Sequence, residues 1–324
     1  MPLPERLGRL RRVDRLGAGG FSTVWLYHDD QLDSHVAVKA LAENWAQRLD
    51  VRERFLEEAR ILRRADSDHI VRVYDIGEVD ATPYFVMTWA DRGTLADRLD
   101  DAPMPFSAVA DLVAQAGAGL AVLHEHGVVH RDVKPQNLLL RSAGTAGERL
   151  LVADLGVAKA MLHASGLTQV VGTPAYMAPE QATGGGVDVR ADVHALAAVA
   201  YQMLTGRLAR SGPISSLAAA ERPVPPSAYV AVPAAVDDVL LGALDPDPER
   251  RPGDVRRFVD DLRRALPGDL PVSVHHPTRL APAAEPTVGP SPASTGRPVA
   301  TALLFALVLA GSFGAAWAVT ALLR

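Results

Sequence analysis

The chain has 324 residues, 48% of them hydrophobic, and is long enough to build a two-lobed fold with a substantial core. Its 33 basic and 38 acidic residues give a formal net charge of −5, so no nucleic-acid partner is expected. Because cysteine is absent, disulfides, a thiolate nucleophile and cysteine-ligated zinc are excluded. The histidines show no H-E-x-x-H spacing, which leaves a metalloprotease without support.

A glycine-rich turn is predicted near the N-terminus, between strands that occupy residues 13–40. The turn reads L-G-A-G-G-F-S-T-V from Leu16 to Val24. Its glycines would let backbone N–H groups approach phosphate oxygens without a Cβ in the way, although an ordinary hairpin has the same pattern. The segment lacks the G-K-[S/T] of a P-loop, and Ser22 stands where a dinucleotide-binding fingerprint has its third glycine.

A helix is predicted over residues 50–64, after a strand that ends at Lys39. Glu57 and Glu58 lie about 100° apart on this helix, so only one of them can face the strand. The apolar residues of the helix fall on one broad face at helical spacing: Val51, Phe55, Ala59 and Leu62.

Two more strands and two helices are predicted next. The strands occupy residues 70–74 and 84–87, with a turn between them. Thr94 is placed as the cap of a short helix. Ser107 is placed as the cap of a long helix that runs to about Glu125 and forms part of the scaffold.

The segment His130–Asn137, H-R-D-V-K-P-Q-N, places a carboxylate, a lysine and an amide in one short loop. Asp132 could accept a proton from an attacking hydroxyl group. Lys134 would donate to a phosphate, and Asn137 offers an amide oxygen to a hard cation such as Mg²⁺. On their own, an aspartate and an asparagine in a loop are more often turn-forming residues.

A second oxygen donor follows a predicted buried strand. Residues 150–153 are apolar, and Asp154 comes directly after them. Asn137 and Asp154 suit Mg²⁺ chemically, because this ion takes oxygen ligands and keeps water and phosphate oxygens at its other positions. Two donors from different loops are a stronger indication than either residue alone.

The string H-R-D-V-K-P-Q-N resembles the catalytic loop of eukaryotic-type (Hanks-type) protein kinases, as found in bacterial serine/threonine kinases. The resemblance covers roughly residues 8–266. The other motifs of that family follow in the same order: the glycine-rich turn, V-A-V-K at 36–39, D-L-G at 154–156 and A-P-E at 178–180. Departures are Ser22 in place of the third glycine and Leu155 in place of phenylalanine.

The resemblance implies an α+β, two-lobed fold. A β-rich N-lobe would occupy residues 1–89 and a mainly helical C-lobe residues 90–266. It also implies a serine/threonine protein kinase that uses ATP and Mg²⁺, with Mn²⁺ as the alternative ion, and that acts on protein substrates. Two rivals are a catalytically inactive scaffold with the same fold and a small-molecule phosphotransferase.

Site residues are also implied by the resemblance. Asp132, Lys134 and Lys39 would be catalytic, and Asn137 and Asp154 would hold the metal. Glu58 would pair with Lys39, with Glu57 as the alternative. The implied nucleotide-binding residues are Leu16, Gly17, Ala18, Gly19, Gly20, Phe21, Ser22, Val24, Ala37, Lys39, Glu58, Met87, Thr88, Ala90 and Asn137.

Control by phosphorylation is expected in the loop of residues 157–180. A phosphate there would add roughly −1.5 to −2 charges, which Arg131 could bind. Thr168 is the first choice of autophosphorylation site and Ser165 the second; ordinary loop hydroxyls are the alternative. Thr173 is expected to support the catalytic loop, as in serine/threonine rather than tyrosine kinases.

Two structural contacts in the large lobe are implied as well. Asp192 would brace the backbone of the catalytic loop, and Arg251 would pair with Glu180 in a buried bridge. His194 is interpreted as structural.

Composition changes near residue 267. Residues 267–298 are rich in proline and poor in large apolar residues, which predicts a juxtamembrane linker. Residues 299–323 carry no charge and exceed the ~20 residues needed to span a bilayer, so a transmembrane helix is predicted there. A buried core helix is the alternative.

The expected location is the plasma (inner) membrane, as a single-pass protein with its kinase region in the cytoplasm. Residues 1–6 are charged and lack a continuous apolar segment, so no signal peptide is expected. Arg297 favours the same orientation. Gly311 with Ala315, and Gly314 with Ala318, offer small faces through which a homodimer could form.

Overall fold

The computed structural model of the chain describes residues 3–101, 103–144, 147–155, 174–183, 185–211 and 222–268. The chain divides into two compact units, Met1–Pro277 and Thr278–Arg324, and all described residues belong to the first. The predicted transmembrane segment 299–323 lies outside the described residues, as do Ser165, Thr168 and Thr173.

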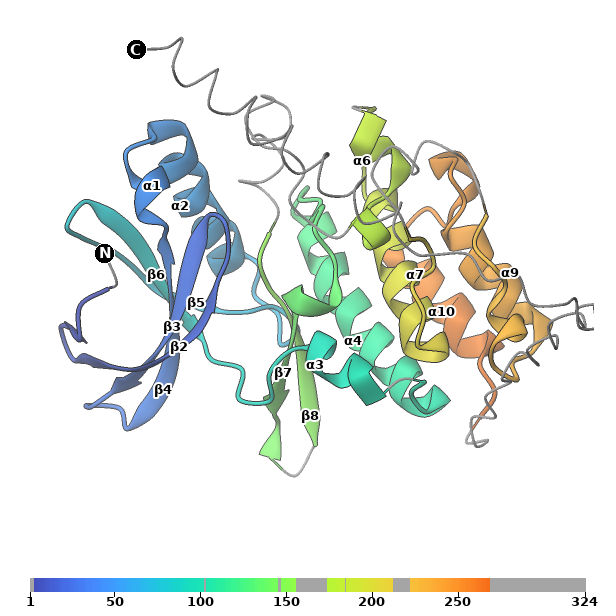
Figure 1. The fold of residues 1–324 in the computed structure, drawn as a ribbon, viewed down its shortest axis with the longest axis horizontal. Coiled ribbons are helices and arrows are strands. Elements are labelled where there is room, and N and C mark those ends of the chain that lie inside the picture. Colours follow the sequence, from blue (N-terminus) through green and yellow to red (C-terminus); the bar gives the residue numbers. More distant parts are fainter. Residues whose placement is uncertain are drawn as a thin grey trace, which may run out of the picture. The chain divides into compact units, whose positions relative to one another are not determined.

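An antiparallel sheet of six strands forms the N-terminal lobe, in the order β1-β2-β3-β4-β6-β5 (Figure 1). Its strands are β1 (Arg6–Leu7), β2 (Leu10–Ala18), β3 (Ser22–Asp29), β4 (Ser34–Leu41), β5 (Val73–Val79) and β6 (Thr82–Thr88). The predicted turn joins β2 to β3, as expected of a glycine-rich segment between two strands.

Side chains of β4 alternate between two hydrophobic clusters. Val38 and Ala40 pack into a small cluster with Tyr27. Ala37 and Leu41 point to the other face and pack into the main core. Because side chains two residues apart share a face, Lys39 lies on the face of the main core.

Helices α1 (Glu43–Ala46) and α2 (Leu49–Arg64) follow β4. The face predicted for α2 is confirmed, because Val51, Phe55, Ala59 and Leu62 are all buried. Phe55 packs on Phe85 of β6 with ring centroids 5.0 Å apart. This packing fixes α2 against the sheet.

The strand predicted over residues 70–74 is wrong at its start. β5 begins at Val73 and continues to Val79, whereas Ile70 forms an isolated parallel bridge with Val152. Val71 donates its backbone N–H to Val152 at 2.9 Å. The apolar residues before β5 therefore connect the two lobes, and their burial comes from this connection.

The C-terminal lobe is mainly helical (Figure 1). Its α-helices are α3 (Leu95–Arg98), α4 (Phe106–Glu125), α6 (Pro179–Thr183), α7 (Arg190–Thr205), α9 (Ala234–Ala243) and α10 (Val255–Ala265). Its strands β7 (Leu138–Ser142) and β8 (Glu148–Val152) pair in an antiparallel hairpin. Short 3₁₀ turns span Leu99–Asp101, Pro135–Asn137, Pro174–Tyr176, Pro226–Ala228 and Pro248–Arg250.

The helix α4 is the one described helix that is long and apolar enough to cross a membrane by length and composition. It lies against α7, α10 and β8. Its residues Val109, Leu120 and Leu123 are fully buried in the main core. This helix is therefore part of the protein interior, as its apolar stripe predicted.

One predicted helix cap is confirmed and the other is wrong. Thr94 caps α3, since its hydroxyl accepts from the Asp97 N–H and its own N–H donates to the Asp97 carboxylate. Ser107 is the second residue of α4, which begins at Phe106. Pro105 occupies the cap position with φ −56° and ψ 142°, and burial of Phe106 places the helix start two residues earlier than predicted.

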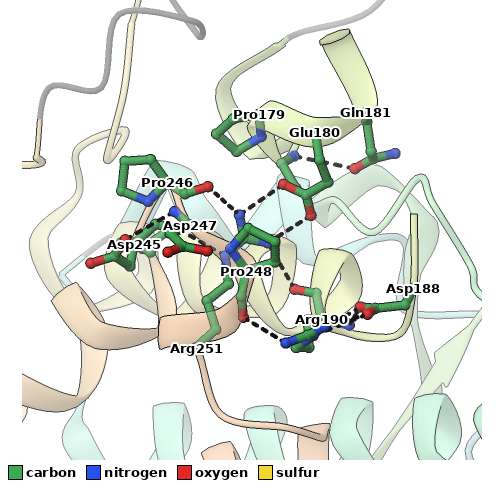
Figure 2. A network of polar contacts seen from close by, with 12 residues as sticks. Pro179, Glu180, Gln181, Asp188, Arg190, Asp245, Pro246, Asp247, Pro248 and Arg251 are labelled. Atoms are coloured by element: carbon green, nitrogen blue, oxygen red, sulfur yellow. Dashed lines mark hydrogen bonds and ion pairs between the residues drawn. The ribbon is translucent and has the colours of Figure 1, made fainter. Parts of the chain in front are cut away.

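The predicted bridge between Arg251 and Glu180 is confirmed (Figure 2). Arg251 Nη1 and Nη2 donate to the two carboxylate oxygens of Glu180 at 2.7 and 2.8 Å. Its Nε donates to the Asp245 carbonyl at 2.7 Å, and its remaining donors reach the carbonyls of Pro246 and Arg190. All five N–H donors of this buried guanidinium therefore have acceptors.

Replacement of Arg251 by alanine should lower the free energy of unfolding by about 3–5 kcal/mol, because the Glu180 carboxylate loses its buried partner. Urea denaturation of the full chain measures this change. The control is Arg250→Ala, whose side chain is 67% exposed and which should change stability by less than ~0.5 kcal/mol. Equal stability of the two variants would contradict the prediction.

Candidate active site

Lys39 lies at the centre of the candidate site and contacts two carboxylates. Its Nζ donates to Glu58 Oε1 at 2.7 Å and to Asp154 Oδ1 at 2.6 Å. The expected pairing with Glu58 is thus confirmed, and Glu57 instead pairs with Arg60 and Arg64 on the outer side of α2. One lysine therefore joins β4, α2 and the segment after β8.

The charge of Lys39 is maintained by these partners. Burial by itself would lower the pKa of the amine, since it disfavours the charged form. The carboxylates of Asp154 and Glu58 outweigh this effect and hold the pKa of Lys39 above its ordinary value. Lys39 is therefore a permanent, buried cation at neutral pH.

Two polar side chains of the loop after α4 converge on the carboxylate of a third residue, Asp132. Lys134 Nζ lies 3.1 and 3.0 Å from the two oxygens of Asp132. Asn137 Nδ2 donates to Asp132 Oδ2 at 2.9 Å and to the Asp132 carbonyl at 2.8 Å. The structure thus brings together the carboxylate, the amine and the amide that the sequence singled out.

A second carboxylate, which is fully buried, supports the backbone of this loop. Asp192 of α7 accepts from the N–H groups of His130 and Arg131 at 2.8 and 2.9 Å. Arg131 has a φ of 65°, in the left-handed region that is costly for a residue with a side chain. The predicted bracing by Asp192 is confirmed, and it holds the loop in this costly conformation.

The β7–β8 hairpin places Asn137 and Asp154 at the same end. Leu138 pairs with Val152, and the Ala153 N–H donates to the Asn137 carbonyl at 2.9 Å. Asn137 therefore precedes one strand of the hairpin, and Asp154 follows the other. Among the residues that the structure describes, no cluster of three or more His, Asp or Glu side chains could hold a metal ion.

The glycine-rich turn is closed by a backbone hydrogen bond and has open space beside two of its glycines. Gly19 donates its N–H to the Ser22 carbonyl at 2.8 Å, which closes the turn. A Cβ built on Gly17 or Gly20 would meet no described atom within 4 Å. Leu16, Gly17 and Ala18 end β2, Phe21 lies at the tip, and Ser22 and Val24 begin β3.

The segment after β6 also adjoins β4. Met87, at the end of β6, pairs with Ala37 of β4, and both side chains are buried. Thr88 donates its backbone N–H to the Arg72 carbonyl at 2.9 Å. That N–H is therefore engaged within the protein, whereas Ala90 follows two residues later, beyond the strand.

Two contacts that support the site were not predicted. Gln181 of α6 donates its side-chain amide to the Arg131 carbonyl at 2.8 Å, which joins the A-P-E segment to the loop. His124 Nε2 lies 2.8 Å from Asp192 Oδ2, which gives the histidine a specific structural role. Neither partner is near in sequence, so no local pattern could have indicated these contacts.

Comparison with known proteins gives a consistent set of similarities. A family model described as protein kinase domain matches residues 10–255. Serine/threonine-protein kinase Pkn1 of Myxococcus xanthus is 38% identical over 276 residues, which are 83% of this chain and 40% of that protein. Serine/threonine-protein kinase PknB of Mycobacterium leprae is 37% identical over 83% of this chain and 44% of that protein. The chain thus spans less than half the length of these two relatives.

A solved structure is similar as well. The crystal structure of the Mycobacterium tuberculosis PknI kinase domain superimposes with a TM-score of 0.64 at 28% sequence identity. The match covers 80% of this chain and 97% of the solved one.

Replacement of Asp192 by asparagine should destabilise the loop that it braces. An amide nitrogen would face backbone N–H donors, and loss of a charge-assisted hydrogen bond costs about 1.5–3 kcal/mol. Hydrogen exchange of the His130 and Arg131 amides should become faster, and the free energy of unfolding should fall.

The control for this variant is Asp188→Asn. Asp188 lies just before the same helix and pairs with Arg190 at a partly exposed position, so its loss should cost about 0–1 kcal/mol. Unchanged exchange at His130 and Arg131 in Asp192→Asn would contradict the prediction.

Proposed function

This chain belongs to the protein kinase family, and on that premise we propose that it transfers the γ-phosphoryl group of ATP to serine and threonine hydroxyls of proteins. The observation that carries the proposal is the presence of two groups of side chains whose segments are joined where the Ala153 N–H donates to the Asn137 carbonyl. One is Lys39 with Glu58 and Asp154, and the other is Asp132 with Lys134 and Asn137. A buried cation such as Lys39 and a carboxylate with a lysine beside it, such as Asp132 with Lys134, suit phosphoryl transfer.

The nucleotide would lie between the glycine-rich turn and β4. Lys39 would hold its phosphate oxygens, because it is a buried cation whose orientation is set by two carboxylates. The turn would contribute backbone N–H groups, since Gly17 and Gly20 leave open space where a Cβ would stand. Met87 and the backbone near Ala90 would border the base.

The residues present fit a magnesium ion. Asn137 and Asp154 offer oxygen donors at one end of the β7–β8 hairpin. The two hydrogen bonds from the Asn137 side chain to Asp132 both use the amide nitrogen Nδ2 and not the amide oxygen. Mg²⁺ accepts few protein ligands and completes its shell with phosphate and water oxygens. Such an ion, with Mn²⁺ as the alternative, would supply positive charge that neutralises the phosphate oxygens.

Asp132 would orient the acceptor hydroxyl and remove its proton. A positioned general base contributes on the order of 10²–10⁴ in rate. Lys134, which already lies 3.0 Å from this carboxylate, would place a positive charge beside the transferring group. The carboxylate is 21% exposed, so a substrate hydroxyl can approach it from solvent.

Control through the loop of residues 157–180 forms part of the proposal. Arg131 adjoins Asp132, and its backbone is held by Asp192 and Gln181. A phosphate on Thr168 or Ser165 would add charge that an arginine binds, and binding would order the loop.

Membrane attachment is proposed from the sequence. Residues 267–298 would act as a linker and residues 299–323 as a single transmembrane helix, with the kinase region in the cytoplasm. Small residues at positions 311, 314, 315 and 318 would allow two such helices to pair as a homodimer.

Asp132→Asn and Lys39→Met should each abolish phosphoryl transfer while the fold is retained. The first removes the proposed base with little change of shape, and the second removes the proposed phosphate-binding cation. The measurement is incubation of the full chain with Mg²⁺ and labelled ATP, with Glu57→Gln as an active control. Normal turnover in both variants would refute the assignment.

Site mapping on the same samples separates the three classes of protein. Label on Thr168 or Ser165, absent in Asp132→Asn, supports a kinase that modifies its own loop. Nucleotide binding without label on the chain or on a generic protein substrate would favour a scaffold or a small-molecule phosphotransferase instead.

Truncation after residue 298 should release the protein from membranes. Loss of residues 299–323 removes the uncharged segment proposed to span the bilayer, and the apolar residues of α4 are buried in the main core. Fractionation with an alkaline wash measures the distribution of the full and truncated chains. A full chain recovered in the wash, or a truncated chain retained in the membrane pellet, would contradict the proposal.

A further inference from the structure

The glycine-rich turn is bonded to the helix α1, which follows β4. The indole Nε1–H of Trp45 donates to the Gly20 carbonyl at 2.8 Å. The ring of Trp45 packs on Phe21 with centroids 5.0 Å apart and an interplanar angle of 41°. The Ala42 N–H also donates to the Phe21 carbonyl at 2.8 Å. Both peptide groups at the tip of the turn are therefore held by α1 and the residue before it.

This contact determines where a backbone donor points. The Gly20 carbonyl and the Phe21 N–H belong to one planar peptide group and point in opposite directions. A hydrogen bond that holds the carbonyl toward Trp45 therefore directs the Phe21 N–H away from α1. Gly20 has no side chain of its own to restrict this peptide, so the restriction comes from Trp45.

The contact also connects the turn to the pair formed by Lys39 and Glu58. Trp45 lies in the chain between these two residues, on a helix that packs against α2. Ala46 is buried beside it, and Trp45 itself packs on the main hydrophobic core. The helix α1 thus contacts both the turn and α2, the helix that carries Glu58.

We propose that Trp45 is a positioning residue that sets nucleotide affinity by holding the glycine-rich turn in one conformation. The proposal rests on the proposed function, in which this turn covers the phosphates of the nucleotide. Without the indole bond, the turn must be ordered when the nucleotide binds, and the entropy cost reduces affinity. The effect is expected on nucleotide binding and not on binding of the protein substrate.

Trp45→Phe in the full chain separates the hydrogen bond from packing, because phenylalanine keeps an aromatic ring beside Phe21 but has no N–H donor. We expect the dissociation constant for ATP with Mg²⁺, measured by calorimetry, to rise about 3- to 10-fold, the effect of one hydrogen bond. The KM for ATP should rise by the same factor, with the KM for a protein substrate unchanged. Hydrogen exchange of residues 19–22 should become faster.

The matched control is Trp25→Phe. Trp25 lies on β3, the strand that follows the turn, and like Trp45 it is partly buried. Its indole N–H donates to the Thr23 hydroxyl at 3.2 Å. This variant should leave both nucleotide affinity and exchange of residues 19–22 unchanged. Thermal denaturation should show that both variants are folded.

Two outcomes would overturn the inference. One is ATP affinity in Trp45→Phe within twofold of the unsubstituted chain. The other is an equal rise in the KM for ATP and for the protein substrate together with a lower Tm, which would indicate a general structural role. Calorimetry measures ATP binding and does not require phosphoryl transfer. A chain that binds ATP but transfers no phosphate would therefore refute the proposed function, while the effect of Trp45→Phe on ATP affinity could still be measured.

Discussion

The buried charge of Lys39 is the constraint on which the rest of the site depends. An isolated ammonium group in the protein interior costs several kcal/mol, so its partners must be supplied by the fold. They come from distant segments, Glu58 on α2 and Asp154 after β8. The three side chains carry one net negative charge, which would suit the divalent cation that is proposed to bind there. Correct assembly of the two lobes is therefore a condition for burying this lysine.

Asp192 has a similar role for the backbone of the loop His130–Asn137. It accepts two N–H groups from consecutive residues, and it is itself fully buried on α7. Arg131 and Asp154 both adopt positive φ values, which are costly for residues with side chains. Arg131 is next to Asp132 in the chain and Asp154 contacts Lys39, so both conformations lie beside residues of the candidate site. The helix α7 and the β7–β8 hairpin thus position the loops of the candidate site.

Several features could be predicted from sequence because they depend on neighbours in the chain. The burial of one face of α2 follows from helical spacing, and the Thr94 cap follows from a threonine three residues before Asp97. The start of α4 and the start of β5 were predicted wrongly. In both cases burial of an apolar residue, Phe106 or Ile70, decided the local structure in a way that propensity does not reveal.

The sequence by itself determined the order of the motifs, the family they resemble, and the candidates for base, cation and metal ligand, because each chemistry requires particular residue types at short spacing. It left open whether Glu57 or Glu58 meets Lys39, and only the packing of α2 on the sheet decided for Glu58. The roles of Gln181, His124 and Trp45 also came only from tertiary structure. Their partners are distant in the chain, and a hydrogen bond between such groups exists only once the chain has folded.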